Sequence, residues 1–393
     1  MKDFLISVII PTRNRQSYAE AAVKNILSLG SDIQIIVQDN SNDDSLYRRL
    51  KTLIDGDRLV YHYRKDKIAG IDNYNIAASY VTGEFFCAIG DDDTVLPSIV
   101  ACAKWMKRNH VDAVRPSKQV YYFWPNPEKG ARNAFLEIGH FTGKAKLYRP
   151  EEGVIELLKN GGQNYLKLPM VGSYHGLVKT KCMKEVRDLT GRFYGGLSPD
   201  MYSAVCLSLL PNIRFADIDY PISLPGICPE STSAASDLGR HIGKLETAPH
   251  FEGLQETYIW DERIPALYSV QTIWCETLFK AICAMHREEL IELYFSREKL
   301  ITAIYNENKN QRKLILESLS KNDRQLLKNN SENNTKSYRK FCSRFLYVMN
   351  FLLRKKYRKY NCKNIENASF YVQKWLNRKV YQKAWKKIDE LQI

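Results

Sequence analysis

The chain has 393 residues, a formal net charge of +14 and 44% hydrophobic residues. This composition is typical of a folded protein of two or three domains, and it excludes a disordered, collagen-like or disulfide-stapled chain. No apolar run approaches the roughly 18–20 residues that a membrane span requires. The nine cysteines are scattered and form no CxxC pair, which predicts a reducing, cytoplasmic environment.

Strand and helix patterns alternate through the first third of the chain. Apolar β-rich runs predict strands at 5–10, 33–37, 59–63 and 85–89, and helical spacing predicts helices at 17–29, 72–81 and 97–109. Such alternation indicates an α/β fold with a mostly parallel sheet between layers of helices. Ligands of these sheets bind beyond the carboxyl ends of the strands.

The pattern is mixed after residue 112. We expect a strand at 121–124, helices at 151–159 and 198–210, a Gly- and Tyr-rich loop that faces substrate at 160–176, and a Ser-, Gly- and Pro-rich loop at 226–250. From 255 to 330 the pattern is helical. The expected domains are therefore 1–245 as the α/β domain that binds the ligand, 246–330 as a helical region, and 331–393 as a basic amphipathic helical tail.

Most of the positive charge lies in that tail. Residues 331–393 hold 16 Lys and Arg against 4 Asp and Glu, whereas residues 1–330 hold 42 against 40. The apolar residues between Phe341 and Leu353 precede the basic run Arg354–Lys359, a pattern typical of an interfacial amphipathic helix. We expect the tail either to bind an anionic membrane surface or to pack on the body with a solvated basic face.

Polar clusters follow three of the predicted strands, at the sheet edge where ligands bind. They are Thr12-Arg13-Asn14, Asp39-Asn40-Ser41 and Asp91-Asp92-Asp93. Adjacent carboxylates raise one another's pKa, and a bound divalent cation removes that cost. Oxygen ligands beside a phosphate suit Mg²⁺ or Mn²⁺. Each cluster alone is compatible with a capped turn, but together they predict a metal–nucleotide site.

The ordered motifs resemble those of the family 2 glycosyltransferases, which have the GT-A fold. Val8-Ile9-Ile10-Pro11-Thr12-Arg13-Asn14 resembles the opening of that family, and Gly90–Pro97 is similar to its metal-binding DXD segment. The resemblance covers roughly residues 4–225. It extends to the bacterial enzymes that assemble surface polysaccharides such as O-antigen.

The resemblance implies a role for each matching residue. Asp39 would contact the nucleotide base, Asn75 would take the place of the asparagine in an Arg-Asn pair, and Asp92 and Asp93 would bind the metal. The other donor-binding residues would be Pro11, Thr12, Arg13, Asn14 and Asp91. Two positions depart from the family pattern: Gly90 stands where the first DXD aspartate is expected, and Tyr74 replaces the arginine. The division of labour among the three aspartates stays open.

A catalytic base is implied at the start of the helix predicted from residue 198. Gly195–Tyr202 is similar to the family's Glu-Asp segment, with Pro199 in place of the glutamate, so Asp200 would take the proton of the acceptor hydroxyl. Its alternative is a helix-start carboxylate stabilised by the dipole. In the loop that follows, Arg240 and His241 are candidates for the metal or the pyrophosphate, and His250 is a second histidine candidate. His175 is a candidate for the acceptor side.

The resemblance implies an inverting, hexosyltransferase-type enzyme that uses a UDP-, GDP- or dTDP-sugar. Together with the basic tail, it implies a saccharide acceptor on a lipid carrier at the inner face of the cell membrane. Two other functions are compatible with parts of the sequence. A nucleic-acid-binding protein would explain the charge and the aromatic residues of the tail, although no binding motif appears and no nucleic acid is expected. A sugar nucleotidyltransferase would need a glycine-rich loop, which Pro11–Asn14 is not.

Overall fold

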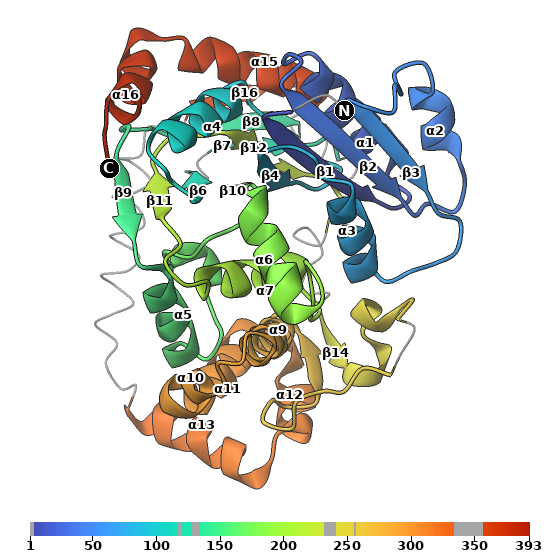
Figure 1. The fold of residues 1–393 in the computed structure, drawn as a ribbon. Coiled ribbons are helices and arrows are strands. Elements are labelled where there is room, and N and C mark those ends of the chain that lie inside the picture. The colour runs from blue at the N-terminus through green and yellow to red at the C-terminus, as the bar shows by residue number, and fades with distance from the viewer. Residues whose placement is uncertain (1–3, 117–119, 127–133, 232–240, 255–256, 334–356) are drawn as a thin grey trace.

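The computed structural model describes residues 4–116, 120–126, 134–231, 241–254, 257–333 and 357–393 (Figure 1). Its centre is an eight-stranded sheet with the order β3-β2-β1-β4-β10-β6-β11-β9. The strands are β1 (Ile6–Thr12), β2 (Ile33–Asp39), β3 (Leu59–Tyr63), β4 (Phe85–Ala88), β6 (Ala113–Pro116), β9 (Ala145–Tyr148), β10 (Leu177–Lys179) and β11 (Phe215–Ile218).

The first four strands of this order form the parallel half of the sheet. β1 pairs in parallel with both β2 and β4, and β2 pairs in parallel with β3. β10 runs antiparallel between β4 and β6, and β9 is antiparallel at the far edge. Every residue of β1 and β2 is buried, as expected for strands with helices on both faces.

Helices cover the two faces of the sheet (Figure 1). Val8 and Ile10 pack with α1 (Gln16–Leu27), α2 (Ser45–Leu50) and α4 (Ser98–Arg108), whereas Ile9 belongs to the core on the opposite face. The alternation follows from the two-residue side-chain period of a strand. The opposite face is covered by α3 (Gly70–Ser79), α5 (Pro150–Lys159), α6 (Thr180–Thr190) and α7 (Pro199–Ser208).

A helical region follows the sheet and packs beneath α7. It consists of α9 (Val270–Ala284), α10 (Glu289–Tyr294), α11 (Arg297–Glu307), α12 (Arg312–Ser318) and α13 (Lys321–Asn333). α9 begins with a capping box between Ser269 and Thr272, which satisfies N–H groups that the first turn leaves open. α9 packs against α7, so the helical region buttresses the helix that carries Asp200.

Three smaller sheets complete the fold. One has the order β13 (Gly226–Ile227), β7 (Val120–Phe123), β8 (Phe135–Ile138) and β16 (Tyr357–Tyr360). The others pair β5 (Thr94–Val95) with β12 (Ser223–Leu224), and β14 (Ile242–Lys244) with β15 (Leu267–Ser269). The expected α/β class, with a largely parallel sheet and a helical C-terminal region, is confirmed.

The C-terminal segment differs from the wholly helical tail that the sequence predicted. Tyr357–Tyr360 is a strand that pairs antiparallel with β8, and its alternating residues suit a sheet edge better than a helix. α15 (Ile365–Leu376) then packs on α1, and α16 (Lys379–Asp389) buries Tyr381, Ala384 and Ile388. The amphipathic stretch predicted from Phe341 and the basic residues Arg354, Lys355 and Lys356 lie outside the described residues.

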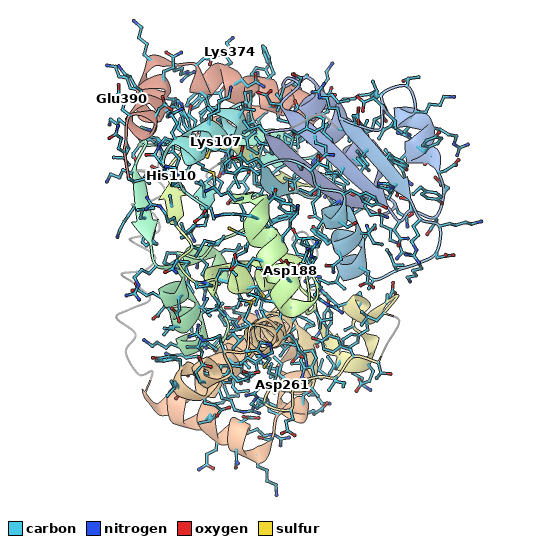
Figure 2. The ribbon with its side chains drawn as sticks, in the orientation of Figure 1. Lys107, His110, Asp188, Asp261, Lys374 and Glu390 are labelled. Atoms are coloured by element: carbon cyan, nitrogen blue, oxygen red, sulfur yellow. The ribbon has the colours of Figure 1, made fainter. Side chains whose placement is uncertain are left out.

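The basic side chains of α15 and α16 face outward. In Figure 2, Lys374 on α15 and Glu390 just after α16 lie at the outer rim of the molecule, on the far side of α4 from α9. The buried face of α16 and the bond from the Trp105 indole to the Leu391 carbonyl fix this segment to the body. Residues 357–393 therefore follow the packed alternative. In the described part of the chain, no helix combines the length and apolar character needed to cross a bilayer.

Candidate functional site

The three consecutive aspartates lie in a buried turn between β4 and β5, beside the carboxyl end of β1. Asp91 accepts hydrogen bonds from the Thr12 hydroxyl at 2.8 Å and from the Arg15 guanidinium at 3.0 Å. Burial raises the pKa of Asp91, while Arg15 opposes that rise. The structure thus brings together the first and third predicted clusters through direct contacts.

Asp93 is held by donors from three segments. Its Oδ1 accepts a hydrogen bond from the Gly226 N–H at 2.7 Å. Its Oδ2 accepts from the Gly90 N–H at 2.7 Å and from the Tyr174 hydroxyl at 2.8 Å. The same Oδ2 lies 3.1 Å from Nε2 of His175. Burial works against ionisation, but His175 and these donors lower the pKa of Asp93. Asp93 is therefore an ionised carboxylate that ties the turn to β13 and to the loop before β10.

Asp92 has a different environment. Its Oδ2 accepts from the Cys228 N–H at 3.0 Å, and the Cys228 side chain also hydrogen-bonds the Asp92 carboxylate. Burial, followed by the charges of Asp93 and Asp91, raises the pKa of Asp92 to about 7. The backbone here is packed tightly: a Cβ on Gly226 would lie 1.7 Å from the Asp92 carbonyl oxygen, so only glycine fits. Asp92 is the member of the triplet whose charge the protein leaves uncompensated.

These contacts test whether the turn suits a divalent cation. Among the described residues, no group of three or more His, Cys, Asp and Glu side chains is arranged to hold a metal by itself. However, Mg²⁺ is commonly held by one or two carboxylates together with substrate phosphates and waters. The raised pKa of Asp92 fits that mode, because a cation would offset the repulsion from Asp91 and Asp93 that contributes to it.

The other predicted donor residues form a connected rim at the ends of β1 and β2. Asn14 has a positive φ of 57°; its N–H donates to Ser41, and its side-chain oxygen accepts from the Asn42 N–H. Thr12 and Pro11 end β1, and Arg13 lies half-buried in the same turn. The first and second predicted clusters are thus joined.

Asp39 is fully buried at the end of β2. Its Oδ1 accepts from the Ser41 N–H at 2.8 Å, which is an Asx turn, and its Oδ2 accepts from the Tyr61 hydroxyl at 2.6 Å. Tyr61 in turn lines a cavity of about 610 Å³ together with Tyr47, Tyr63, Lys65 and residues 42–44. Asp39 orients one wall of an aromatic cavity beside the strand ends.

The Asn75 side chain hydrogen-bonds backbone groups of α3 and of the loop before α7. Its amide donates to the carbonyl oxygens of Ile71 and Tyr194, and its side-chain oxygen accepts from the N–H groups of Phe193 and Tyr194. The side chain therefore fastens α3 to the loop that leads to Asp200. Its predicted contact with the donor stays a prediction.

Asp200 lies in the first turn of α7 and lines a cavity of about 590 Å³. Its Oδ1 accepts from the Ser198 hydroxyl at 2.6 Å, and its Oδ2 accepts from the Tyr165 hydroxyl. The cavity walls are rich in aromatic side chains, which include Tyr74, Tyr165, Tyr174, Tyr268 and Trp274. This places the predicted base in a hollow that can hold a substrate, and the Gly- and Tyr-rich loop at 160–176 contributes to it as expected.

Tyr174 connects this cavity to the aspartate turn. Its ring lines the cavity of Asp200, and its hydroxyl donates to Asp93. A single side chain therefore contacts the aspartate turn and lines the cavity that contains Asp200. Neither Tyr174 nor Arg15 was predicted from the sequence, although Arg15 stands next to the Thr-Arg-Asn cluster. His175 was predicted on the acceptor side, whereas it contacts Asp93 and Ser223.

The predicted loop histidines line the same cavity. The rings of His241 and His250 are 6.4 Å apart, and both are near Tyr268 at 5.9 and 5.6 Å between centroids. Burial lowers the pKa of His250 to about 4, with a further contribution from His241. Arg240 lies outside the described residues.

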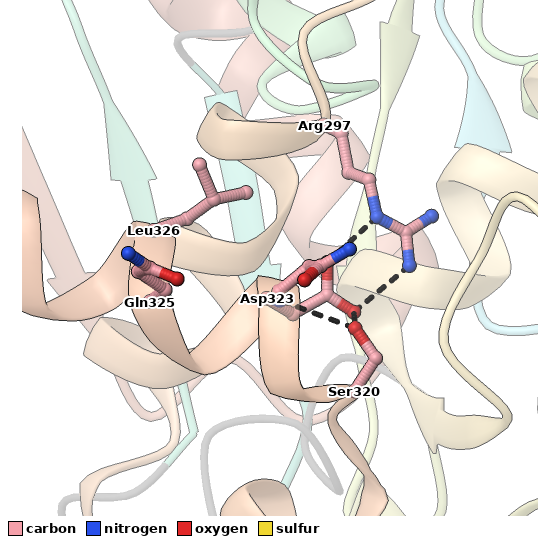
Figure 3. Close-up of a pocket in the computed structure, with 6 residues that line it drawn as sticks. Arg297, Ser320, Asp323, Gln325 and Leu326 are labelled. Carbon is pink, nitrogen blue, oxygen red and sulfur yellow. Dashed lines mark hydrogen bonds and ion pairs between the residues drawn. The ribbon is translucent and has the colours of Figure 1, made fainter.

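Another cavity, of about 490 Å³, lies in the helical region (Figure 3). There Asp323 receives two hydrogen bonds from Arg297, at 2.7 and 2.9 Å, and one from the Ser320 hydroxyl at 2.8 Å. The carboxylate is already paired, and the Ser320 hydroxyl caps the start of α13 by accepting from the Asp323 N–H at 3.1 Å. We interpret this arrangement as a clamp between α11 and α13.

Comparisons with known proteins agree with the site. Residues 7–156 match the family model described as "Glycosyl transferase family 2". The chain is therefore similar to the family 2 glycosyltransferases over this range, which includes β1, Asp39 and the aspartate turn.

A curated relative and several solved structures are similar to parts of the chain. The GalNAc(5)-diNAcBac-PP-undecaprenol beta-1,3-glucosyltransferase of Campylobacter jejuni is 38% identical over 96 residues, which is 23% of this chain and 30% of that protein. S. aureus TarS 1–349 in complex with UDP-GlcNAc has a TM-score of 0.43 at 13% identity, covering 77% of this chain and 80% of that one. Mannosyltransferase PcManGT from Pyrobaculum calidifontis, in complex with GDP-Man and Mn²⁺, has a TM-score of 0.41 and covers 96% and 89%.

Proposed function

We propose that this protein transfers a sugar from a nucleoside-diphosphate donor to a hydroxyl group of a saccharide acceptor, with inversion at the anomeric carbon. The observation that carries the proposal is the link through Tyr174, which joins the aspartate turn to the cavity of Asp200. A donor held at the turn would present its sugar to that cavity. An acceptor in the cavity would then place its hydroxyl beside Asp200.

The donor side of this proposal rests on the rim around β1 and β2. The base of a UDP-, GDP- or dTDP-sugar would occupy the aromatic cavity beside Asp39 and Tyr61. Arg13 and the N–H groups of the turn that ends β1 would meet the diphosphate. Asp91 fixes Arg15 and Thr12 at this position and thereby shapes the diphosphate site.

Asp92 would hold Mg²⁺ or Mn²⁺ together with the diphosphate, and Asp93 would keep the turn in place. When bound, the cation would supply electrostatic stabilisation of the departing diphosphate. The same neutralisation would keep Asp92 ionised in spite of its raised pKa. His175 and Tyr174 hold Asp93 so that Asp92 keeps its orientation.

Asp200 would act as the general base. Its two oxygens already receive hydrogen bonds from Ser198 and Tyr165, which orient the carboxylate toward the cavity. It would take the proton of the acceptor hydroxyl as that oxygen attacks the anomeric carbon, while the bond to the diphosphate breaks on the opposite face. A single displacement of this kind inverts the centre.

The acceptor is proposed to be a saccharide on a lipid carrier, in polysaccharide or O-antigen assembly. The support is the similarity to the Campylobacter glucosyltransferase, whose name specifies an undecaprenol-linked saccharide. We further propose that the protein works at the inner face of the cell membrane, with the basic C-terminal region attracted to anionic lipid. Vesicle co-sedimentation that is insensitive to ribonuclease would support this location, and binding that requires RNA would contradict it.

A donor panel tests the proposal directly. The full chain is incubated with UDP-, GDP- and dTDP-sugars in the presence of Mn²⁺, Mg²⁺ or EDTA, and thermal stabilisation and sugar hydrolysis are measured. We expect at least one donor to stabilise the protein and to be hydrolysed slowly, and EDTA to abolish both effects. If no donor stabilises the protein with either metal, the proposed function is wrong.

A further inference from the structure

Two buried polar atoms in the wall of the Asp200 cavity have no hydrogen-bond partner among the described residues. They are the hydroxyl oxygen of Tyr268 and Nδ1 of His250. Only 5% of the Tyr268 surface is exposed. Buried polar groups are nearly always paired, because an unpaired one loses its hydration without compensation. Both residues line the cavity, so a ligand bound there is the simplest partner for the two atoms.

The Tyr268 ring is held in a fixed position. It packs with Leu197, Ala248 and Ile273 in a small apolar cluster. In the pair of strands β14 and β15, Tyr268 lies opposite Gly243. A Cβ built on Gly243 would lie 3.9 Å from the Tyr268 ring, which is van der Waals contact. These contacts hold the ring, and with it the hydroxyl, in one position, as a recognition group requires.

The chemistry of the wall indicates what kind of group it binds. No lysine or arginine is among the described residues that line the cavity, and Asp200 is its one acidic side chain there. Burial keeps Tyr268 and His250 uncharged at neutral pH, since it raises the pKa of the phenol and lowers that of the imidazole to about 4. A diphosphate in this cavity would meet the Asp200 carboxylate and no lysine or arginine of the described residues. A neutral sugar would meet aromatic faces and uncharged hydrogen-bonding groups.

We infer that Tyr268 and His250 form a specificity subsite that hydrogen-bonds a hydroxyl or acetamido group of an uncharged acceptor sugar next to Asp200. This inference rests on the proposed function for the identity of the acceptor side. It also assigns the loop histidine His250 to the acceptor and not to the metal. Both residues lie outside the segment that matches the family model, so this subsite is a property of the C-terminal half of the chain.

Binding of simple glycosides to the full chain tests the subsite. The probes are the methyl glycosides of glucose, galactose, N-acetylglucosamine and N-acetylgalactosamine, with methyl glucuronide as the anionic comparison, and binding is measured by saturation-transfer NMR titration. We expect at least one uncharged glycoside to bind more tightly than the glucuronide. Tyr268→Phe and His250→Asn should each weaken that binding by about 2- to 12-fold, the range for one uncharged hydrogen bond.

The controls separate recognition from folding. Tyr305→Phe changes a tyrosine on α11 outside the cavity, and His110→Asn changes an exposed histidine after α4; both should bind glycosides as the wild type does. Because the Tyr268 hydroxyl has no partner among the residues that the structure describes, Tyr268→Phe should leave the melting temperature unchanged or raise it. A merely structural hydroxyl would lower it.

Two outcomes would overturn the inference. One is a wild-type protein that is stabilised by a nucleotide sugar but binds none of the uncharged glycosides. The other is a Tyr268→Phe and His250→Asn pair that binds glycosides with wild-type affinity. Failure of the proposed function is distinguishable, because it appears as the absence of donor stabilisation and donor hydrolysis, whatever the glycosides do.

Discussion

The Tyr174 hydroxyl donates a hydrogen bond of 2.8 Å to Oδ2 of Asp93, and the ring that carries it lines the cavity of Asp200. One side chain thus belongs both to the buried aspartate turn and to the cavity on the α7 side of the sheet. Burial and the nearby charge of Asp93 raise the pKa of Tyr174, so the phenol remains a donor.

Tyr174→Phe is expected to destabilise the protein by removing the hydrogen bond to Asp93. The change removes a hydrogen bond to a charged group, which costs about 1.5–3 kcal/mol of unfolding free energy. Tyr194→Phe is the matched control, since its hydroxyl contacts the uncharged Ser173 at 3.2 Å and should cost about 0.5–1.5 kcal/mol. Denaturant unfolding of the two variants measures the difference, and equal losses would contradict the assigned role of Tyr174.

Asp200→Asn is expected to abolish transfer and preserve donor binding. The amide keeps the shape of the carboxylate but cannot accept the proton, so the rate should fall by about 10²- to 10⁴-fold. Asp188→Asn, on the exposed surface of α6 (Figure 2), controls for loss of charge and should be fully active. Transfer assays and donor-induced thermal shifts report the two properties separately. A variant that transfers at the wild-type rate would place the base elsewhere.

Asp92→Asn is expected to stabilise the metal-free protein while it removes the effect of the metal. Burial and the charges of its two acidic neighbours make ionisation of the wild-type carboxylate unfavourable, and they raise its pKa to about 7. A neutral amide relieves that repulsion and should add about 0.5–2 kcal/mol to the unfolding free energy. Thermal scans with and without Mn²⁺ test both effects. Asp93→Asn should instead destabilise, because it leaves His175 without its ionised partner.

The stability of the protein should fall with acid through His250. In the unfolded chain a histidine takes up its proton near pH 6.5, whereas His250 in the fold does so only near 4. Between these values the unfolded state binds more protons, so the unfolding free energy decreases as the pH falls. His250→Asn removes this contribution. Urea unfolding from about pH 7.5 to 4.5 should show the wild type losing on the order of 1–3 kcal/mol relative to the variant; parallel curves would exclude this role.

Gly143 provides a test of how α16 docks. Its φ is +69°, and a Cβ there would lie 2.0 Å from the carbonyl oxygen of Ala384 in α16. Gly191 has a similar φ of +78°, but a Cβ would meet nothing within 4 Å. Gly191→Ala should therefore cost only the strain of the left-handed backbone, about 1–2 kcal/mol, and Gly143→Ala should cost clearly more because α16 must move. Similar unfolding free energies in the two variants would mean that α16 is not held at this position.

The sequence by itself determined the strand-and-helix half of the fold. The predicted strands at 5–10, 33–37, 59–63 and 85–89 correspond to β1, β2, β3 and β4, because buried parallel strands leave continuous apolar runs. It also placed the three polar clusters at the correct strand ends, and the structure joins them through Thr12, Asn14 and Ser41. Local patterns suffice for such features because each depends on neighbouring residues.

Only the tertiary structure decided how the three aspartates differ. Their sequence is a uniform triplet, but Arg15, His175 and Cys228 approach from three separate segments and give each carboxylate its own partner. The tertiary structure also decided the burial of residues 357–393. Their sequence by itself indicates a charged helix, but they form a strand and two helices that pack on β8, α1 and α4. The pKa of a carboxylate and the burial of a helix face depend on residues far apart in the chain, and no local pattern encodes those partners.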